Sequence, residues 1–146
     1  MANPLKKRNR DRRGSAIVEM AVVTPFLLLL TFGLLEYGWM FLKSEQITNA
    51  ARSGARYAAT AVVTSSGQVT GSSSPAVQFL TASGIPVQAG TVTVPTGVNP
   101  GVGNPVTVTV TVPYSSIQFT GFPGLPTPAS LTASVTMAKE GFTSGS

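Results

Sequence analysis

The chain has 146 residues and a net charge of +5, and it contains neither histidine nor cysteine. Beyond position 45 its only acidic side chain is Glu140, so the composition speaks against an enzyme, and we expect no catalytic residues, no metal site and no cofactor. Without cysteine there are no disulfide bonds to stabilise a small fold.

The positive charge is concentrated at the N-terminus. Six of the ten basic residues and the only aspartate lie within residues 1–14, and the rest of the chain carries equal numbers of positive and negative side chains. A basic run beside an apolar segment is held on the cytoplasmic side of a membrane by the positive-inside bias. We interpret residues 1–14 as a cytoplasmic leader. A nucleic-acid-binding arm is the competing interpretation, but no basic or aromatic surface follows it, so we expect no nucleic-acid partner.

Residues 15–42 form an apolar segment that is long enough to cross a bilayer. The segment has 28 residues, which span about 42 Å as a helix, whereas the hydrocarbon core needs only about 20 residues. Because backbone polar groups must be paired in lipid, we expect a helix. Tyr37 and Trp39 suit the outer interface. The sequence thus predicts a single-pass protein whose N-terminus is cytoplasmic and whose first partner is the lipid bilayer.

The junction between leader and apolar segment combines Gly14, Ser15 and Glu19. A charged leader that ends in glycine, followed by an acid five residues into an apolar helix, is typical of pilin-type precursors, which are cut on the cytoplasmic side. A cut after Gly14 leaves an amino group on Ser15, and a carboxylate attracts such a cation strongly at low dielectric. We predict that Gly14 and Ser15 flank a processing site. Glu19 is predicted to dock one subunit against the next, because the two groups meet more naturally between staggered helices than within one.

Glu36 is the second acid inside the apolar segment. A carboxylate in a membrane segment costs about 3 kcal/mol and by default marks a functional position. At about 100° per residue, Glu36 lies about 100° around the helix from Glu19, so one partner face is not expected to serve both. Glu36 is therefore a candidate for a second intramembrane contact. The alternative is that it reaches the outer interface beside Lys43.

Residues 43–60 contain no proline and are expected to continue the helix beyond the membrane. Small residues recur at every fourth position, as in Ala50, Gly54 and Ala58, and such rows let two backbones approach closely. We predict that this row is a helix-packing surface. It either covers the domain that follows, which we favour, or contacts the helix of another subunit.

These features together resemble the N-terminal region of the TadE/TadG-like pilus assembly proteins, the pseudopilins of the tight-adherence (Tad/Flp) pilus system. The resemblance covers residues 12–60 and rests on the Gly14/Glu19 junction, the apolar core, Phe32-Gly33 with Glu36-Tyr37-Gly38, Thr48-Asn49-Ala50-Ala51-Arg52, and Gly54-Ala55-Arg56-Tyr57-Ala58. Since the chain is short, it is more similar to the TadE kind.

The resemblance implies a pseudopilin of the bacterial inner membrane that a prepilin peptidase cuts after Gly14. Its implied partners are that peptidase, other pilins and pseudopilins, and the Tad inner-membrane assembly proteins. The implied function is the assembly of adhesive pili, and the resemblance leaves open whether the protein enters the filament.

Residues 61–146 are rich in Thr, Val, Ser, Gly and Pro. We expect them to form a small head. Pro75 opens one short helix and Gly84 ends it. Alternation of apolar and polar residues predicts three strands, each with one apolar face, at 91–94, 106–112 and 130–138. The expected fold class is α+β, in which a long transmembrane helix extends outward and is followed by a small antiparallel β-rich head with one short helix.

A loop over residues 115–129 joins the last two predicted strands and carries Phe119, Phe122 and Leu125, which we expect to be exposed. Tyr114, Phe119 and Phe122 are candidates for a binding patch, although such residues more often belong to a core or its rim. A second function class therefore stays open: an uncleaved, signal-anchored envelope protein that presents a small β-rich binding domain.

Overall fold

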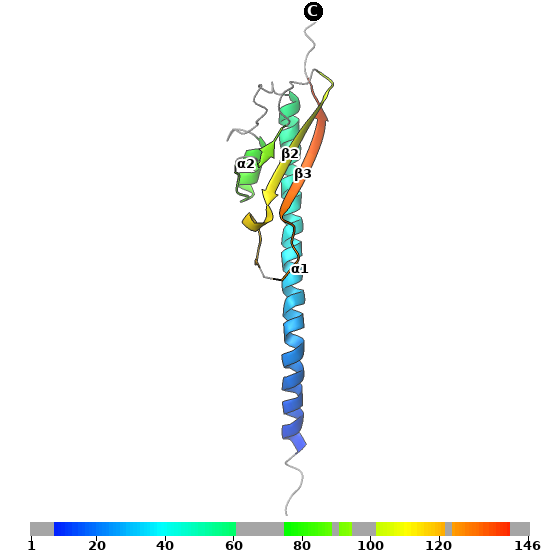
Figure 1. Cartoon of the computed structure of the whole chain (residues 1–146), viewed down its shortest axis with the longest axis vertical. Helices are drawn as coiled ribbons and strands as arrows, with labels where there is room; N and C mark the ends of the chain where they lie inside the picture. The colour runs from blue at the N-terminus through cyan, green and yellow to red at the C-terminus, as the bar shows by residue number, and fades with distance from the viewer. Residues whose placement is uncertain (1–7, 61–74, 89–90, 95–101, 122–123, 141–146) are drawn as a thin grey trace, which may run out of the picture.

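Figure 1 shows the computed structural model, which describes residues 8–60, 75–88, 91–94, 102–121 and 124–140. A single long helix, α1 (Arg8–Thr60), forms the axis of the molecule, and the other elements pack against its C-terminal half. These elements are α2 (Pro75–Ala82), β1 (Val92–Thr93), β2 (Pro105–Pro113), the 3-10 turn η2 (Tyr114–Ser116) and β3 (Ser130–Ala138). The predicted α+β class is confirmed.

Helix α1 is continuous over 53 residues. Pro25 lies inside it and has no backbone N–H to donate, yet the helix runs on through this position. One residue earlier, the Thr24 hydroxyl donates to the carbonyl of Met20 at 2.6 Å. The expected continuation of the helix beyond the apolar segment is confirmed as far as Thr60.

The three strands form one antiparallel sheet in the order β1-β2-β3. Strand β2 lies in the centre, with Val110 opposite Val92 of β1 and Val108 opposite Val135 of β3. Side chains alternate between the two faces of a strand, and this alternation buries the four valines of β2: Val106, Val108, Val110 and Val112. The strands and the apolar faces predicted from the sequence are therefore observed.

The core of the head is completed by α1. Small side chains let the helix approach β2 and α2 closely, and the buried residues of this helix face are Ile47, Ala50, Ala51, Gly54, Ala55 and Ala58. The closest approach is at Gly54, where an added Cβ would lie 3.0 Å from Ala76 Cβ and 3.2 Å from Val108 Cγ1. The predicted packing surface thus covers the chain's own head, and α2 and the three strands share one core with the helix.

Two local contacts stabilise helix ends in the head. Gly84, with a φ of 66°, follows α2, and the amide of Ile85 donates back to the carbonyl of Leu80 at 2.9 Å, which caps the helix as the sequence predicts. At the far end of the molecule the Lys139 ammonium donates to the carbonyl of Ala58 at 3.0 Å. A cation at this position stabilises the negative end of the α1 dipole.

Candidate functional site

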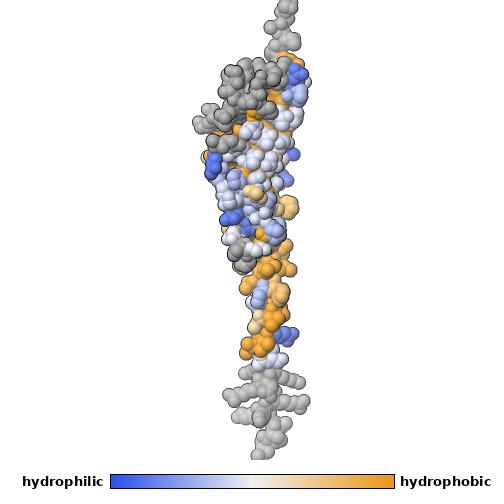
Figure 2. Space-filling model, in the orientation of Figure 1, coloured by the Kyte–Doolittle hydropathy of each residue, from blue (hydrophilic) through white to orange (hydrophobic). Residues whose placement is uncertain are grey.

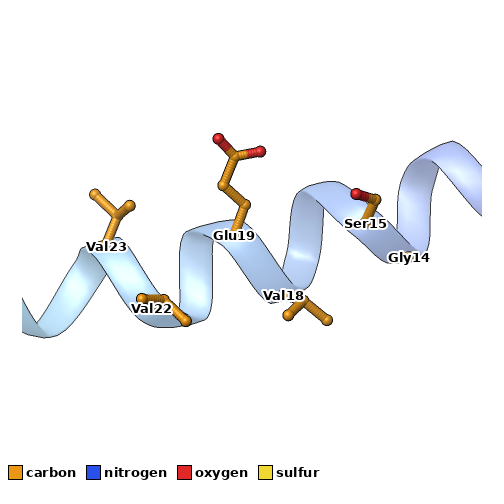
Figure 3. A pocket seen from close by; sticks show the side chains of 6 residues that line it. All are labelled: Gly14, Ser15, Val18, Glu19, Val22 and Val23. Atoms are coloured by element: carbon orange, nitrogen blue, oxygen red, sulfur yellow. The ribbon is translucent and has the colours of Figure 1, made fainter.

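The predicted processing site lies near the start of α1. Figure 3 shows Ser15 and Glu19 one turn apart on the same side of the helix, with the Glu19 carboxylate directed away from the ribbon. Gly14, Ser15 and Glu19 are all exposed. Among the residues that the structure describes, Glu19 forms neither a hydrogen bond nor an ion pair, so its carboxylate is open to a group from another molecule.

The helix around this site is apolar and uncovered. Figure 2 shows a hydrophobic band on the helix below the head, and it includes exposed side chains from Ile17 to Leu35. In the part of the chain that the structure describes, α1 is the one helix long and apolar enough to cross a membrane. Almost none of its apolar stretch is buried in the protein, unlike the core helix of a soluble domain. The structure is consistent with single-pass membrane anchoring.

Glu36 occupies a different environment, because the head of its own chain surrounds its carboxylate. The residue is only 2% exposed. One carboxylate oxygen accepts hydrogen bonds from the Tyr114 hydroxyl at 2.6 Å and the Phe119 amide at 3.3 Å. The other accepts from the amide and the hydroxyl of Thr120, at 2.8 and 2.6 Å. Glu36 thus fastens α1 to the turn and loop that follow β2.

The four donors explain how an acid is tolerated at this level of the helix. Burial penalises a carboxylate, but hydrogen bonds donated to its oxygens stabilise the charged form. Burial also raises the pKa of Tyr114, and the hydrogen bond to the Glu36 carboxylate raises it further, so the phenol stays a donor. The Glu36–Tyr114–Thr120 cluster is therefore a buried, fully satisfied polar contact.

The sequence left open that Glu36 reaches the outer interface beside Lys43. In the structure the contacts of Lys43 are to other residues. The Lys43 ammonium donates to the carbonyl of Ser83 at 3.0 Å and lies 4.9 Å from the centre of the Trp39 ring. Both carboxylate oxygens of Glu36 accept hydrogen bonds within this chain. A contact between Glu36 and another subunit stays a prediction.

Sequence reasoning missed the partners of Glu36. Tyr114 and Phe119 were considered only as binding-patch, core or rim residues; Tyr114 is buried, and Phe119 is 55% exposed at the rim. The sequence did contain a signal for Tyr114. A buried acid needs hydrogen-bond donors, and Tyr114 offers a hydroxyl directly after the Val–Thr run that forms β2. Phe122 lies outside the described residues.

Removing the Tyr114 hydroxyl tests this contact. Tyr114→Phe is expected to lower the free energy of unfolding of the detergent-solubilised protein by about 1.5–3 kcal/mol, because it removes a hydrogen bond to a buried charged group. Denaturant titration measures the change. Tyr57→Phe is the matched control, since the Tyr57 side chain is 44% exposed and should shift stability by less than about 0.5 kcal/mol. Equal losses in the two variants would contradict the assigned role.

Comparison with known families agrees with the resemblance seen in the sequence. Residues 14–56 match the family model of the TadE-like proteins. Comparison with curated proteins and comparison with solved structures gave no match. The matched range begins at Gly14, includes Glu19, Glu36 and Gly54, and ends within α1, so the TadE-like resemblance is confirmed for the junction and most of the helix.

Proposed function

We propose that this protein is a membrane-anchored pseudopilin that a prepilin peptidase cuts after Gly14 and that acts in the assembly of Tad/Flp-type adhesive pili. One observation carries the proposal: the TadE-like match starts at Gly14, where the basic leader meets an apolar helix that carries an exposed Glu19. The proposed location is the bacterial inner membrane, with the leader in the cytoplasm and the head outside.

The proposed docking step follows from the geometry of the junction. Cleavage frees an ammonium group on Ser15, one helical turn from Glu19, which is about 6 Å along the axis. When a second helix is shifted by one turn, its Glu19 comes level with the Ser15 ammonium of the first. In low dielectric this pair attracts strongly and is poorly screened by salt. The exposed apolar half of α1 supplies the surface along which the two helices pack.

The proposed partners follow from the cleavage and docking steps. The peptidase must reach Gly14 and Ser15, both of which are exposed on α1. Other pilins or pseudopilins are the proposed source of the neighbouring helix, and Tad inner-membrane assembly proteins are the proposed machinery. The head reaches outward from the membrane and is held to α1 by its shared core and by Glu36.

Glu19→Ala tests the assembly role. In a strain that lacks the chromosomal copy, the variant is expected to accumulate in the membrane at the normal level but to reduce sheared surface pili at least tenfold. The reason is that the Ser15 ammonium of the neighbouring subunit then has no counter-ion. Quantitative immunoblots of membrane and sheared fractions measure both. Glu45→Ala is the control, because Glu45 is an exposed acid on the same helix. Normal piliation with Glu19→Ala would show that the docking role is wrong.

A further inference from the structure

The lowest part of the head reaches down α1 to the apolar half of the helix. We call residues 117–121 and 124–129 the foot. Figure 1 shows this connection between η2 and β3 beside α1, at the end of the head nearest the exposed helix. The Trp39 indole donates to the carbonyl of Ile117 at 2.6 Å, and the Tyr37 hydroxyl donates to that of Pro126 at 2.9 Å. Leu125 lies against Gly33.

At the level of the foot, the helix remains apolar and uncovered on its other side. Four exposed side chains lie there, with exposed fractions of 48–69%: Leu34, Leu35, Phe41 and Leu42. The foot and these exposed side chains therefore lie at the same level of α1, between Gly33 and Leu42. A contact encircling the helix at one depth fits a lipid surface better than a partner protein that approaches from one side.

The depth agrees with the dimensions of a bilayer. Counted from Ser15, about 20 residues span the hydrocarbon core and reach Leu34. The two interfacial regions together add about 10–15 Å, so the outer one alone is about 5–8 Å thick, which at about 1.5 Å per residue takes the helix from Leu34 to about Trp39. The helix positions that hold the foot, from Gly33 to Trp39, therefore fall at the outer boundary between acyl chains and headgroups.

The chemistry of the foot suits that boundary. No charged side chain occurs between Arg56 and Lys139 in the sequence, so the foot approaches lipid without desolvating a charge. Phe119 is 55% exposed and stacks at a tilt on Trp39, with ring centres 5.4 Å apart. Aromatic rings of this kind settle at membrane interfaces. The nearby acid, Glu36, is shielded by its four hydrogen bonds.

From these observations we infer that the foot is a second membrane contact, resting in the headgroup–acyl boundary of the outer leaflet. The inference builds on the membrane anchoring in the proposed function and adds a surface of the head to it. Contact through both α1 and the foot fixes the depth and rotation of the helix, and it holds the head against the bilayer.

Fluorescence quenching tests the inference, because Trp39 is the only tryptophan. In a Trp39→Phe background, which keeps an aromatic ring at this position and the hydrogen bond from Tyr37 to the foot, one tryptophan probe is introduced at a time. The probes are Phe119→Trp and Thr127→Trp in the foot, Leu28→Trp in the apolar helix and Tyr57→Trp at the level of the upper head. The full-length proteins are reconstituted in phosphatidylcholine vesicles that carry bromines at shallow or deep acyl positions. The foot probes are expected to be quenched at least threefold more than Tyr57→Trp, and more by shallow than by deep bromines.

The Leu28→Trp probe separates the possible outcomes. If Leu28→Trp is quenched by deep bromines while both foot probes behave like Tyr57→Trp, the anchor stands and the foot contact is wrong. If Leu28→Trp is not quenched either, the membrane anchoring in the proposed function fails. If the foot probes escape bromine quenching but are protected from acrylamide only at high protein-to-lipid ratio, a second copy covers the foot and the lipid contact is overturned.

Discussion

Replacing Glu36 by alanine is expected to lower the free energy of unfolding of the protein by about 3–5 kcal/mol. The substitution removes the acceptor for four hydrogen bonds and leaves the hydroxyl of the buried Tyr114 without its carboxylate partner. Unpaired buried donors cost more than the hydrogen bond itself contributes. Because these donors belong to the connection after β2, the loss should first appear as opening of residues 114–121 away from α1.

Denaturant titration in detergent measures the total loss, and amide hydrogen exchange locates it. Glu36→Gln is expected to be intermediate, since an amide keeps one acceptor oxygen but places an NH₂ group against donors at the position of the other. Glu45→Gln is the control for removing a negative charge from an exposed position on α1, and it should change stability by less than about 0.5 kcal/mol. A loss below about 1 kcal/mol for Glu36→Ala would contradict the buried contact.

Replacing Gly54 by leucine is expected to destabilise the head by about 3 kcal/mol, the upper end of overpacking costs. Even the first added carbon would meet the Cβ of Ala76 in α2 at 3.0 Å and a methyl group of the fully buried Val108 in β2 at 3.2 Å, and the Ala76 Cβ cannot move without shifting α2. Gly54→Ala adds only that carbon and should cost about 1 kcal/mol net, because alanine recovers about 1 kcal/mol of helix propensity.

Gly38→Ala is the matched control on the same helix. An added Cβ at Gly38 meets nothing within 4 Å, so this variant should gain about 0.5–1 kcal/mol from helix propensity alone. Thermal unfolding of the three variants compares them directly. Equal stability of Gly54→Leu and the wild-type protein would show that α1 does not pack against the head as described.

Periodicity made the elements of the fold predictable. The alternating Val–Thr run of β2 has one buried face in any sheet, and the apolar run of α1 has few stable states other than a helix. The small residues from Ala50 to Ala58 showed that something packs closely on α1. They did not show what packs there, because a glycine accepts a strand of its own chain as readily as the helix of another.

The environment of Glu36 could not be predicted from the sequence. Its donors lie 78–84 residues further along the chain, in a turn and a loop that have no periodic pattern. Their position depends on where β2 lies along α1, and β2 approaches the helix closely at Gly54. Glu19 differs, because its proposed role depends on local features: the leader, Gly14 and the apolar helix.

The intact mass of the protein purified from membranes of its native cells decides whether a peptidase removes the leader. We expect a mass that corresponds to a chain starting at Ser15, with the leader of residues 1–14 absent. A mass that corresponds to a chain starting at Met1 or Ala2 would contradict it. In that case the protein would be an uncleaved anchor that presents its β-rich head outside the membrane.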